Sequence, residues 1–388
     1  MKISGRIAMW RFWSLIAGAL LLTFPAHAAE TFQDIRVQDA NATRPQLVFA
    51  CDRQTKELDA LFTPELISDL KELGAGIALS TEDFSPERTQ VVRRLNAAGI
   101  PMTAWIALPK DQGYYVNVDT ATQTAVRFAE FDKWTTDNGL KWEAVGLDIE
   151  PTLNDYSALM GHKGQLLRML FKRSFDSGRV YRGRDAYNAL IQTIRSRGYR
   201  VQTYQLTFML HERNAHTTLL ERIFGIVDVR GDQEVFMLYT SFDHKGGAAQ
   251  IWRYGPQSQV IAVGSTASSG DAAMDAKYPP LNWEEFSRDL IVAHHFSPIV
   301  GVYSLEGCVK QGFIPKLKTM EWTQPVVIPA ESLHQAAKVA NGIHAVLWLG
   351  SHLIYFIVAF LLALMWMVRV IVRWRKRRSR AREFSVTA

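Results

Sequence analysis

The chain has 388 residues, of which 48% are hydrophobic and 11% aromatic, and its formal charge is +6. This length and composition are those of a folded protein with a substantial core. The positive charge is concentrated at the two ends: Lys2, Arg6 and Arg11 open the chain, and the segment from Arg369 onward holds eight Lys or Arg against one Glu. The region between the ends is net negative, which argues against a nucleic-acid partner.

The first 28 residues have the features of a secretory signal peptide. A positively charged start precedes an apolar run at 13–24, and Ala26-His27-Ala28 is a small-x-small cleavage pattern. We therefore expect cleavage after Ala28 and a folded domain in the periplasm or outside the cell. An uncleaved N-terminal anchor is the alternative.

Eight short apolar runs then alternate with helical patterns. Ser85 followed by Pro86 is typical of a helix start, and Gly139 of a helix end. Regular alternation of strands and helices predicts a parallel sheet with crossover helices, and eight such units fit an α/β fold of the (β/α)8 TIM-barrel type over 29–320. An open doubly wound sheet is the alternative, although its glycine fingerprint is absent. The eight runs are 47–50, 76–79, 102–107, 144–149, 201–208, 235–239, 260–263 and 299–304.

The fourth run ends in two acidic residues. Side chains alternate along a strand, so Gly146, Asp148 and Glu150 share one face. In a barrel this is the inner face at the carboxyl ends of the strands, where active sites lie. Burying two carboxylates for structure alone is costly, so we interpret them as a catalytic pair. A salt bridge or a capping role is the alternative.

Two short motifs resemble those of family 18 glycoside hydrolases, the chitinase-like TIM barrels. Residues 148–150 match the D-x-E pattern that ends strand four in that family, and residues 237–239 match its M-x-Y pattern on strand six. The family has two further aspartates upstream on strand four, where this chain has Glu143 and Gly146.

The resemblance implies roles for three residues. Glu150 would protonate the leaving glycosidic oxygen, Asp148 would orient a substrate N-acetyl group that acts as the nucleophile, and Tyr239 would donate a hydrogen bond to that group. For a substrate without an N-acetyl group, a second carboxylate must act as nucleophile or base. Glu306, just after the eighth run, is the preferred candidate.

Other residues near the predicted strand ends are candidates for substrate binding. Aromatic rings there can stack on sugars, although core packing is the simpler role for any one of them. The candidates are Asp52, Trp105, Tyr115, Tyr156, Gln205 and Tyr303, and the further carboxylates considered are Glu82, Asp83, Asp111, Glu212 and Asp243. No cofactor or metal is expected, because no zinc-binding spacing of Cys and His occurs.

The two cysteines, Cys51 and Cys308, follow the first and eighth predicted strands. These strands are neighbours in a closed barrel, so in an oxidising compartment the pair is expected to form a disulfide across the seam. Two buried free thiols are the alternative.

The C-terminal region predicts a membrane anchor. Between 345 and 368 only His352 can carry charge near neutral pH. A helix of about 24 residues is about 36 Å long, which exceeds the roughly 30 Å thickness of a hydrocarbon core. Trp348 and Trp366 lie near the two expected interfaces. We expect a juxtamembrane linker at 321–343, a transmembrane helix at 344–368 and a basic cytoplasmic tail at 369–388 that contacts lipid. A buried core helix is the alternative.

Together these features predict a single-pass protein of the plasma (inner) membrane. Its extracytoplasmic barrel would be a glycoside hydrolase that acts on an envelope or extracellular polysaccharide. A catalytically inactive barrel that binds a glycan or a protein is the alternative.

Overall fold

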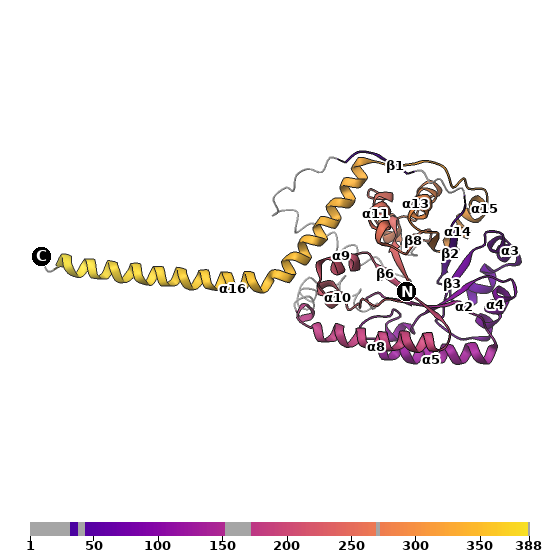
Figure 1. The fold of residues 1–388 in the computed structure, drawn as a ribbon, viewed down its shortest axis with the longest axis horizontal. Coiled ribbons are helices and arrows are strands. Elements are labelled where there is room, and N and C mark those ends of the chain that lie inside the picture. Colours follow the sequence, from indigo (N-terminus) through magenta and orange to yellow (C-terminus); the bar gives the residue numbers. More distant parts are fainter. Residues whose placement is uncertain (1–31, 38–42, 152–171, 269–271, 387–388) are drawn as a thin grey trace.

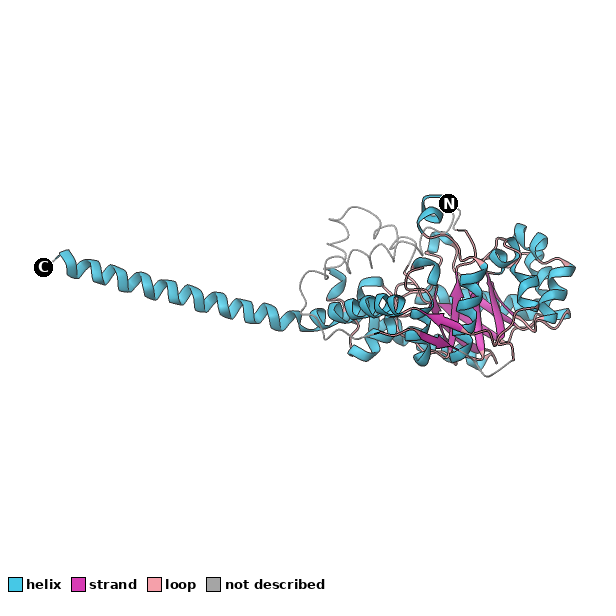
Figure 2. Cartoon of the chain, turned by 90° about the horizontal axis from the view of Figure 1, so that it is seen from above, coloured by secondary structure: helices cyan, strands magenta, loops and turns pink. Residues whose placement is uncertain are grey.

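The structure is a computed structural model that describes residues 32–37, 43–151, 172–268 and 272–386. Eight parallel strands form a closed barrel in chain order, as predicted, and an open sheet is therefore excluded (Figures 1 and 2). The last strand pairs with the first, with Ala50 opposite Tyr303. The strands are β2 (Gln46–Cys51), β3 (Gly76–Ser80), β4 (Met102–Ile106), β5 (Ala144–Asp148), β6 (Arg200–Leu206), β7 (Gln233–Leu238), β8 (Val260–Gly264) and β9 (Ile299–Tyr303).

The helices surround the barrel, and α4 begins and α5 ends at the residues predicted from the sequence. The Ser85 side chain accepts a hydrogen bond from the Arg88 amide at the start of α4, and Gly139 ends α5 with a left-handed φ of 63°. The helices are α2 (Thr55–Leu61), α3 (Pro64–Glu72), α4 (Pro86–Ala97), α5 (Ala121–Asn138), α8 (Ser177–Ser196), α9 (Phe208–Ala215), α10 (Leu219–Phe224), α11 (Ala248–Tyr254), α12 (Ala272–Lys277), α13 (Trp283–Phe296), α14 (Leu305–Lys310), α15 (Phe313–Lys318) and α16 (Ala330–Val386), with short turns η1 (Lys110–Gln112), η2 (Thr240–Phe242) and η3 (Gly255–Gln257).

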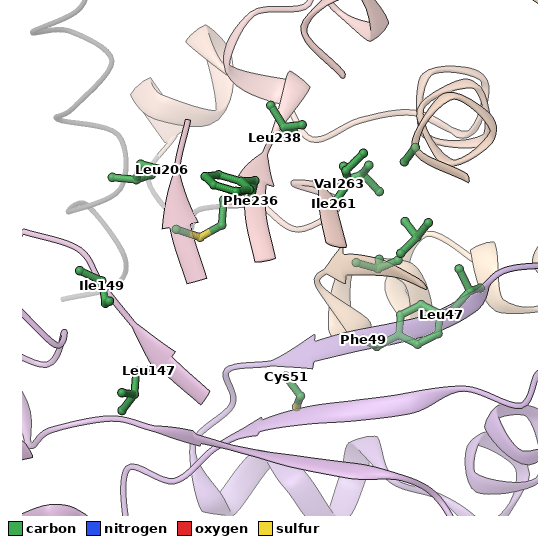
Figure 3. Close-up of a cluster of buried hydrophobic side chains, with 14 of the residues drawn as sticks. Leu47, Phe49, Cys51, Leu147, Ile149, Leu206, Phe236, Leu238, Ile261 and Val263 are labelled. Atoms are coloured by element: carbon green, nitrogen blue, oxygen red, sulfur yellow. The ribbon is translucent and has the colours of Figure 1, made fainter. Parts of the chain in front are cut away.

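The two faces of the barrel strands have different surroundings. Leu47, Phe49 and Cys51 of β2 belong, with Leu147 and Ile149, to one buried hydrophobic cluster (Figure 3). These alternating residues face the helix layer. The intervening residues of each strand therefore face the barrel interior.

A small second sheet and the start of α16 complete the domain. Strand β1 (Ile35–Val37) pairs antiparallel with β10 (Val326–Ile328), so the segments before and after the barrel meet. The first turns of α16 pack on α9, α10 and α11, and Leu333, Ile343 and Leu347 are buried there. Residues 321–343, expected to be a linker, are therefore packed against the barrel, because their alanine-rich helix has an apolar face.

Beyond this packed root, α16 projects away from the barrel (Figure 1). Within the described residues no helix is both long and apolar enough to cross a bilayer, so the transmembrane helix expected at 344–368 is not found there. Several side chains of that stretch, and the whole of the predicted signal peptide 1–28, lie outside the described residues.

The predicted disulfide is wrong in this structure, where Cys51 and Cys308 are both free and buried. Cys51 lies on the helix-facing side of β2. Cys308 is not at a strand end but within α14, and its Sγ atom lies 3.6 Å from Oγ1 of Thr266. Burial raises the pKa of both thiols, that of Cys308 to about 12, so neither is a reactive thiolate at neutral pH.

We expect both thiols to be protected in the native protein. Iodoacetamide should add to neither cysteine of the folded chain and to both after denaturation without reductant, and dithiothreitol should leave the Tm unchanged. Intact-protein mass measures the number of adducts. An unreduced, denatured chain that accepts no adduct would show that the disulfide forms after all.

Candidate active site

Asp148 and Glu150 lie together on the inner face at the carboxyl end of β5. Leu147 and Ile149 occupy the helix-facing side, which leaves the two acids on the barrel side, and each acid is only 2% exposed. This is the placement that the sequence predicted. Both carboxyl groups thus lie at the end of the barrel where the active sites of TIM barrels are found.

The backbone around these acids is held by the loop that follows β4. The Val116 amide donates to the Asp148 carbonyl at 3.2 Å, and the Glu150 amide donates to the Val116 carbonyl at 3.1 Å. On the other side, the Ile149 amide donates to the Tyr204 carbonyl at 3.2 Å. Contacts on both sides therefore extend the strand past Asp148 and fix where Glu150 projects.

Aromatic residues from two further strands lie at the same end of the barrel. Tyr239 follows β7 and Tyr303 ends β9, and their rings stack with centroids 5.4 Å apart at 29°. Phe242 lies next to Tyr239, at 6.5 Å between centroids. Trp105 of β4 pairs in register with Gly146 of β5 and shares its inward face. The structure thus brings three predicted aromatics to the inner face of the barrel.

A second acidic cluster lies at the seam between β2 and β9. The Tyr114 hydroxyl donates to Oδ1 of Asp52, and Nε of Arg53 lies 3.6 Å from Oε1 of Glu306. Burial raises the pKa of Glu306 to about 7, with the Asp52 charge adding to the rise and Arg53 opposing it. A carboxyl group with this pKa can exchange a proton near neutral pH.

Tyr114 also has an unusual backbone conformation, with a φ of 63°. A left-handed conformation is costly for a bulky residue and is found most often at functional sites. Its ring contacts Tyr115 edge-on, and both rings are buried. Tyr115, a predicted substrate-binding residue, is therefore packed within the loop, next to the Tyr114 ring whose hydroxyl contacts Asp52.

Strand β6 contributes Tyr204, which was not among the residues predicted from the sequence. Gln205, the predicted residue, is fully buried and donates to the Val229 carbonyl at 2.9 Å on the helix side. Tyr204 is in register with Asp148 and packs with residues of the barrel interior. The buried apolar Val201 was the available signal, because its alternation places Gln205 outside and Tyr204 inside.

The remaining predicted carboxylates are held by structural contacts or lie elsewhere. Although partial burial opposes it, hydrogen bonds from Arg88, Ser85 and Thr55 lower the pKa of Asp83 well below its usual range. Burial raises the pKa of Glu212 to about 7, but this carboxylate accepts bonds from the amides of Leu220 and Glu221 in α10.

Glu82 lies 3.7 Å from the Arg88 guanidinium, Asp243 accepts bonds from Gly246 and Gln250, and Asp111 is exposed on η1. Tyr156 lies outside the described residues. The described ranges hold no group of three or more His, Cys, Asp or Glu side chains suited to a metal ion.

Comparisons with protein-family models and with curated protein sequences find no match. Among solved structures, the PgaB (BpsB) glycoside hydrolase domain from Bordetella bronchiseptica is similar at a TM-score of 0.43 and 10% identity, over 72% of this chain and 99% of that one. An endo-beta1,6-glucanase gives 0.38 and 11%, over 72% and 70%. D-Psicose 3-epimerase from Clostridium cellulolyticum H10 gives 0.33 and 12%, over 78% and 99%.

The raised pKa of Glu306 predicts a pH-dependent loss of stability. Between about 4.5 and about 7 the folded state binds more protons at this group than the unfolded state, so the free energy of unfolding falls as pH rises. Glu306→Gln removes this loss and should gain up to roughly 3 kcal/mol relative to wild type above pH 7.

Urea unfolding followed from pH 4.5 to 8 measures this difference. Glu143→Gln, a change at an exposed residue, is the matched control and should follow wild type at every pH. Parallel stability curves for Glu306→Gln and wild type would contradict the assignment.

Proposed function

We propose that this chain is a carbohydrate-acting barrel that hydrolyses glycosidic bonds in a polysaccharide, with Glu150 as the general acid. The observation that carries the proposal is the burial of two carboxyl groups, Asp148 and Glu150, on the inner face of β5 at the carboxyl end of the barrel. This is the end of a TIM barrel at which active sites lie, and glycoside hydrolysis uses a pair of carboxyl groups.

The family 18 resemblance supplies the most specific version of the mechanism. Glu150 would give its proton to the leaving oxygen while the N-acetyl oxygen of the substrate attacks the anomeric carbon. Asp148 would hold the N-acetyl group in place through its N–H, and the Tyr239 hydroxyl would donate to the acetyl oxygen. The stacked rings of Tyr239 and Tyr303 offer an apolar surface of the kind on which sugars pack.

A substrate without an N-acetyl group requires a second carboxylate as nucleophile or base. Glu306 suits that role, because its pKa of about 7 lets it accept a proton near neutral pH. Its place after β9 is four strands from β5 in either direction around the barrel.

Glu150→Gln tests the role of the general acid. The amide retains the shape of the side chain but has no acidic proton, so hydrolysis of a glycan that wild type cleaves should fall about 100-fold or more. Release of reducing ends from a panel of envelope and extracellular polysaccharides measures the activity. Glu143→Gln is the matched control, because it changes the same residue type at the opposite end of the same strand. Turnover that survives in Glu150→Gln would contradict the proposed mechanism.

The alternative is a barrel that binds glycan without cleaving it. It is favoured if wild type retains an oligosaccharide in equilibrium dialysis but releases no reducing ends. In that case Glu150→Gln would leave the Kd nearly unchanged, because the acid would have no reaction to serve.

We further propose that the chain is exported and attached to the plasma membrane. The support is in the sequence: a cleavable signal pattern ends at Ala28, and the stretch 345–368 is followed by a basic tail. Expressed in a bacterial host, the chain should lack residues 1–28 and stay with the membranes after carbonate extraction. A variant ending at residue 350, which keeps the buried Leu347, should move to the periplasmic extract. Recovery of the full chain in the cytosol with residues 1–28 retained would contradict this.

A further inference from the structure

Gly146 and Tyr204 fit together in the barrel interior. A Cβ atom added at Gly146 would lie 2.8 Å from Cε2 of Tyr204 and 3.4 Å from Cγ2 of Thr103. Carbon atoms that are not bonded to one another do not approach to 2.8 Å without one of them moving. The ring of Tyr204 therefore occupies the space that any side chain at position 146 would need.

Tyr204 is also the direct neighbour of Asp148. The two residues are in register on the adjacent strands β5 and β6, so both side chains face the interior side by side. The Tyr204 ring reaches back along the strand to Gly146, which precedes Asp148 on the same face of β5. Asp148 thus has an aromatic ring beside and behind it.

The ring itself is held from the opposite end of the barrel. The Tyr204 hydroxyl donates to Oε1 of Gln202 at 3.0 Å, and Nε2 of Gln202 donates to Oε1 of Gln233 at 2.8 Å. Burial, together with the charges of Asp148 and Tyr239, raises the pKa of Tyr204 well above its usual range, so the hydroxyl remains a donor. The ring also packs on a small apolar cluster of Val235, Val260 and Ala262.

We propose that Tyr204 is a positioning residue for Asp148, and that position 146 is glycine because only glycine admits the Tyr204 ring. The chain of Gln233, Gln202 and Tyr204 anchors the ring, and the ring limits how far the Asp148 side chain can retreat into the barrel. The catalytic consequence rests on the proposed function: a displacement of about 1 Å at a catalytic group can cost about 100-fold in rate. The geometric claim stands apart from it.

A double-substitution cycle in the full chain tests the pairing. Gly146→Ala pushes the ring away, Tyr204→Ala removes it, and the third variant combines both. The first readout is the ¹³Cγ resonance of Asp148, assigned by its absence in Asp148→Asn. The second readout, on a glycan that wild type cleaves, is kcat and KM.

Two further variants separate the contributions. Tyr204→Phe retains the ring but loses its hydrogen bond to Gln202, so it should move the Asp148 resonance and lower kcat less than Tyr204→Ala does. Gly76→Ala adds a Cβ at another inward glycine on β3, a strand that does not adjoin β5, and this Cβ would lie 3.3 Å from the Pro101 carbonyl oxygen and 3.5 Å from Cγ2 of Val48. It should leave the Asp148 resonance unmoved, which separates positioning of Asp148 from general strain in the interior.

The expected result is that Gly146→Ala and Tyr204→Ala each move the Asp148 resonance. Each should also lower kcat about 100-fold with a smaller change in KM. In the Tyr204→Ala background, Gly146→Ala should add little to either effect, because the ring with which it clashes is absent.

An unmoved Asp148 resonance in both single variants, or effects that simply add in the double variant, would overturn the proposal. These outcomes are distinct from a failure of the proposed function. If wild type cleaves no glycan the hydrolase assignment fails, and the resonance measurements still decide whether Tyr204 positions Asp148.

Discussion

The pairing of β9 with β2 is the constraint on which the remaining structure depends. It closes the sheet, and without it two strands would expose unpaired edges. In a closed barrel every strand has one face toward the interior and one toward the helices. Alternate side chains of β5 therefore point into the barrel, and Asp148 is among them. It also joins the first and last strands of the barrel, which is how Asp52 and Glu306 come to influence each other electrostatically. The two acidic clusters of the candidate site then lie on opposite sides of one ring of strands.

The end of the barrel that carries these acids is held by buried arginines. Arg88, which has no exposed surface, donates to the Ser80 carbonyl at the end of β3. Arg127 donates to the carbonyls of Thr81 and Ala107, at 2.7 and 3.2 Å, just after β3 and β4. Arg127 therefore holds the first residues of the loop after β4, the loop whose Val116 bonds to the backbone of Glu150. Buried guanidinium groups satisfy carbonyls that the sheet ladder leaves unpaired, and they keep a site rich in carboxylates rigid.

Much of the fold could be predicted from the sequence, because strand composition and helix signals are local. All eight barrel strands lie where apolar runs occur, and the alternation in β5 places Asp148 and Glu150 correctly. Gln205 was misplaced because polar side chains occupy both faces of β6, so that only the apolar Val201 indicates which face points toward the helices.

Contacts between segments far apart in the sequence could not be predicted from such local patterns. The chain turns into α14 directly after β9, so Cys308 lies within a helix beside Thr266, and both cysteines are free. The hydrogen bond between Tyr114 and Asp52 joins residues that are 62 positions apart. Its existence depends on the path of a loop in which two consecutive residues, Gly113 and Tyr114, have positive φ values.

The antiparallel pairing of β1 with β10 has a consequence for how the domain can come apart. Ile35 lies opposite Ile328, so the strand before the barrel and the strand after it depend on each other for their hydrogen bonds. If either strand detaches, the other loses its hydrogen-bond partners, so the segments before and after the barrel are held together by this non-covalent pairing. A force applied to α16 would reach the pairing of β1 with β10 before it reaches the pairing of β2 with β9, because β10 immediately precedes the helix.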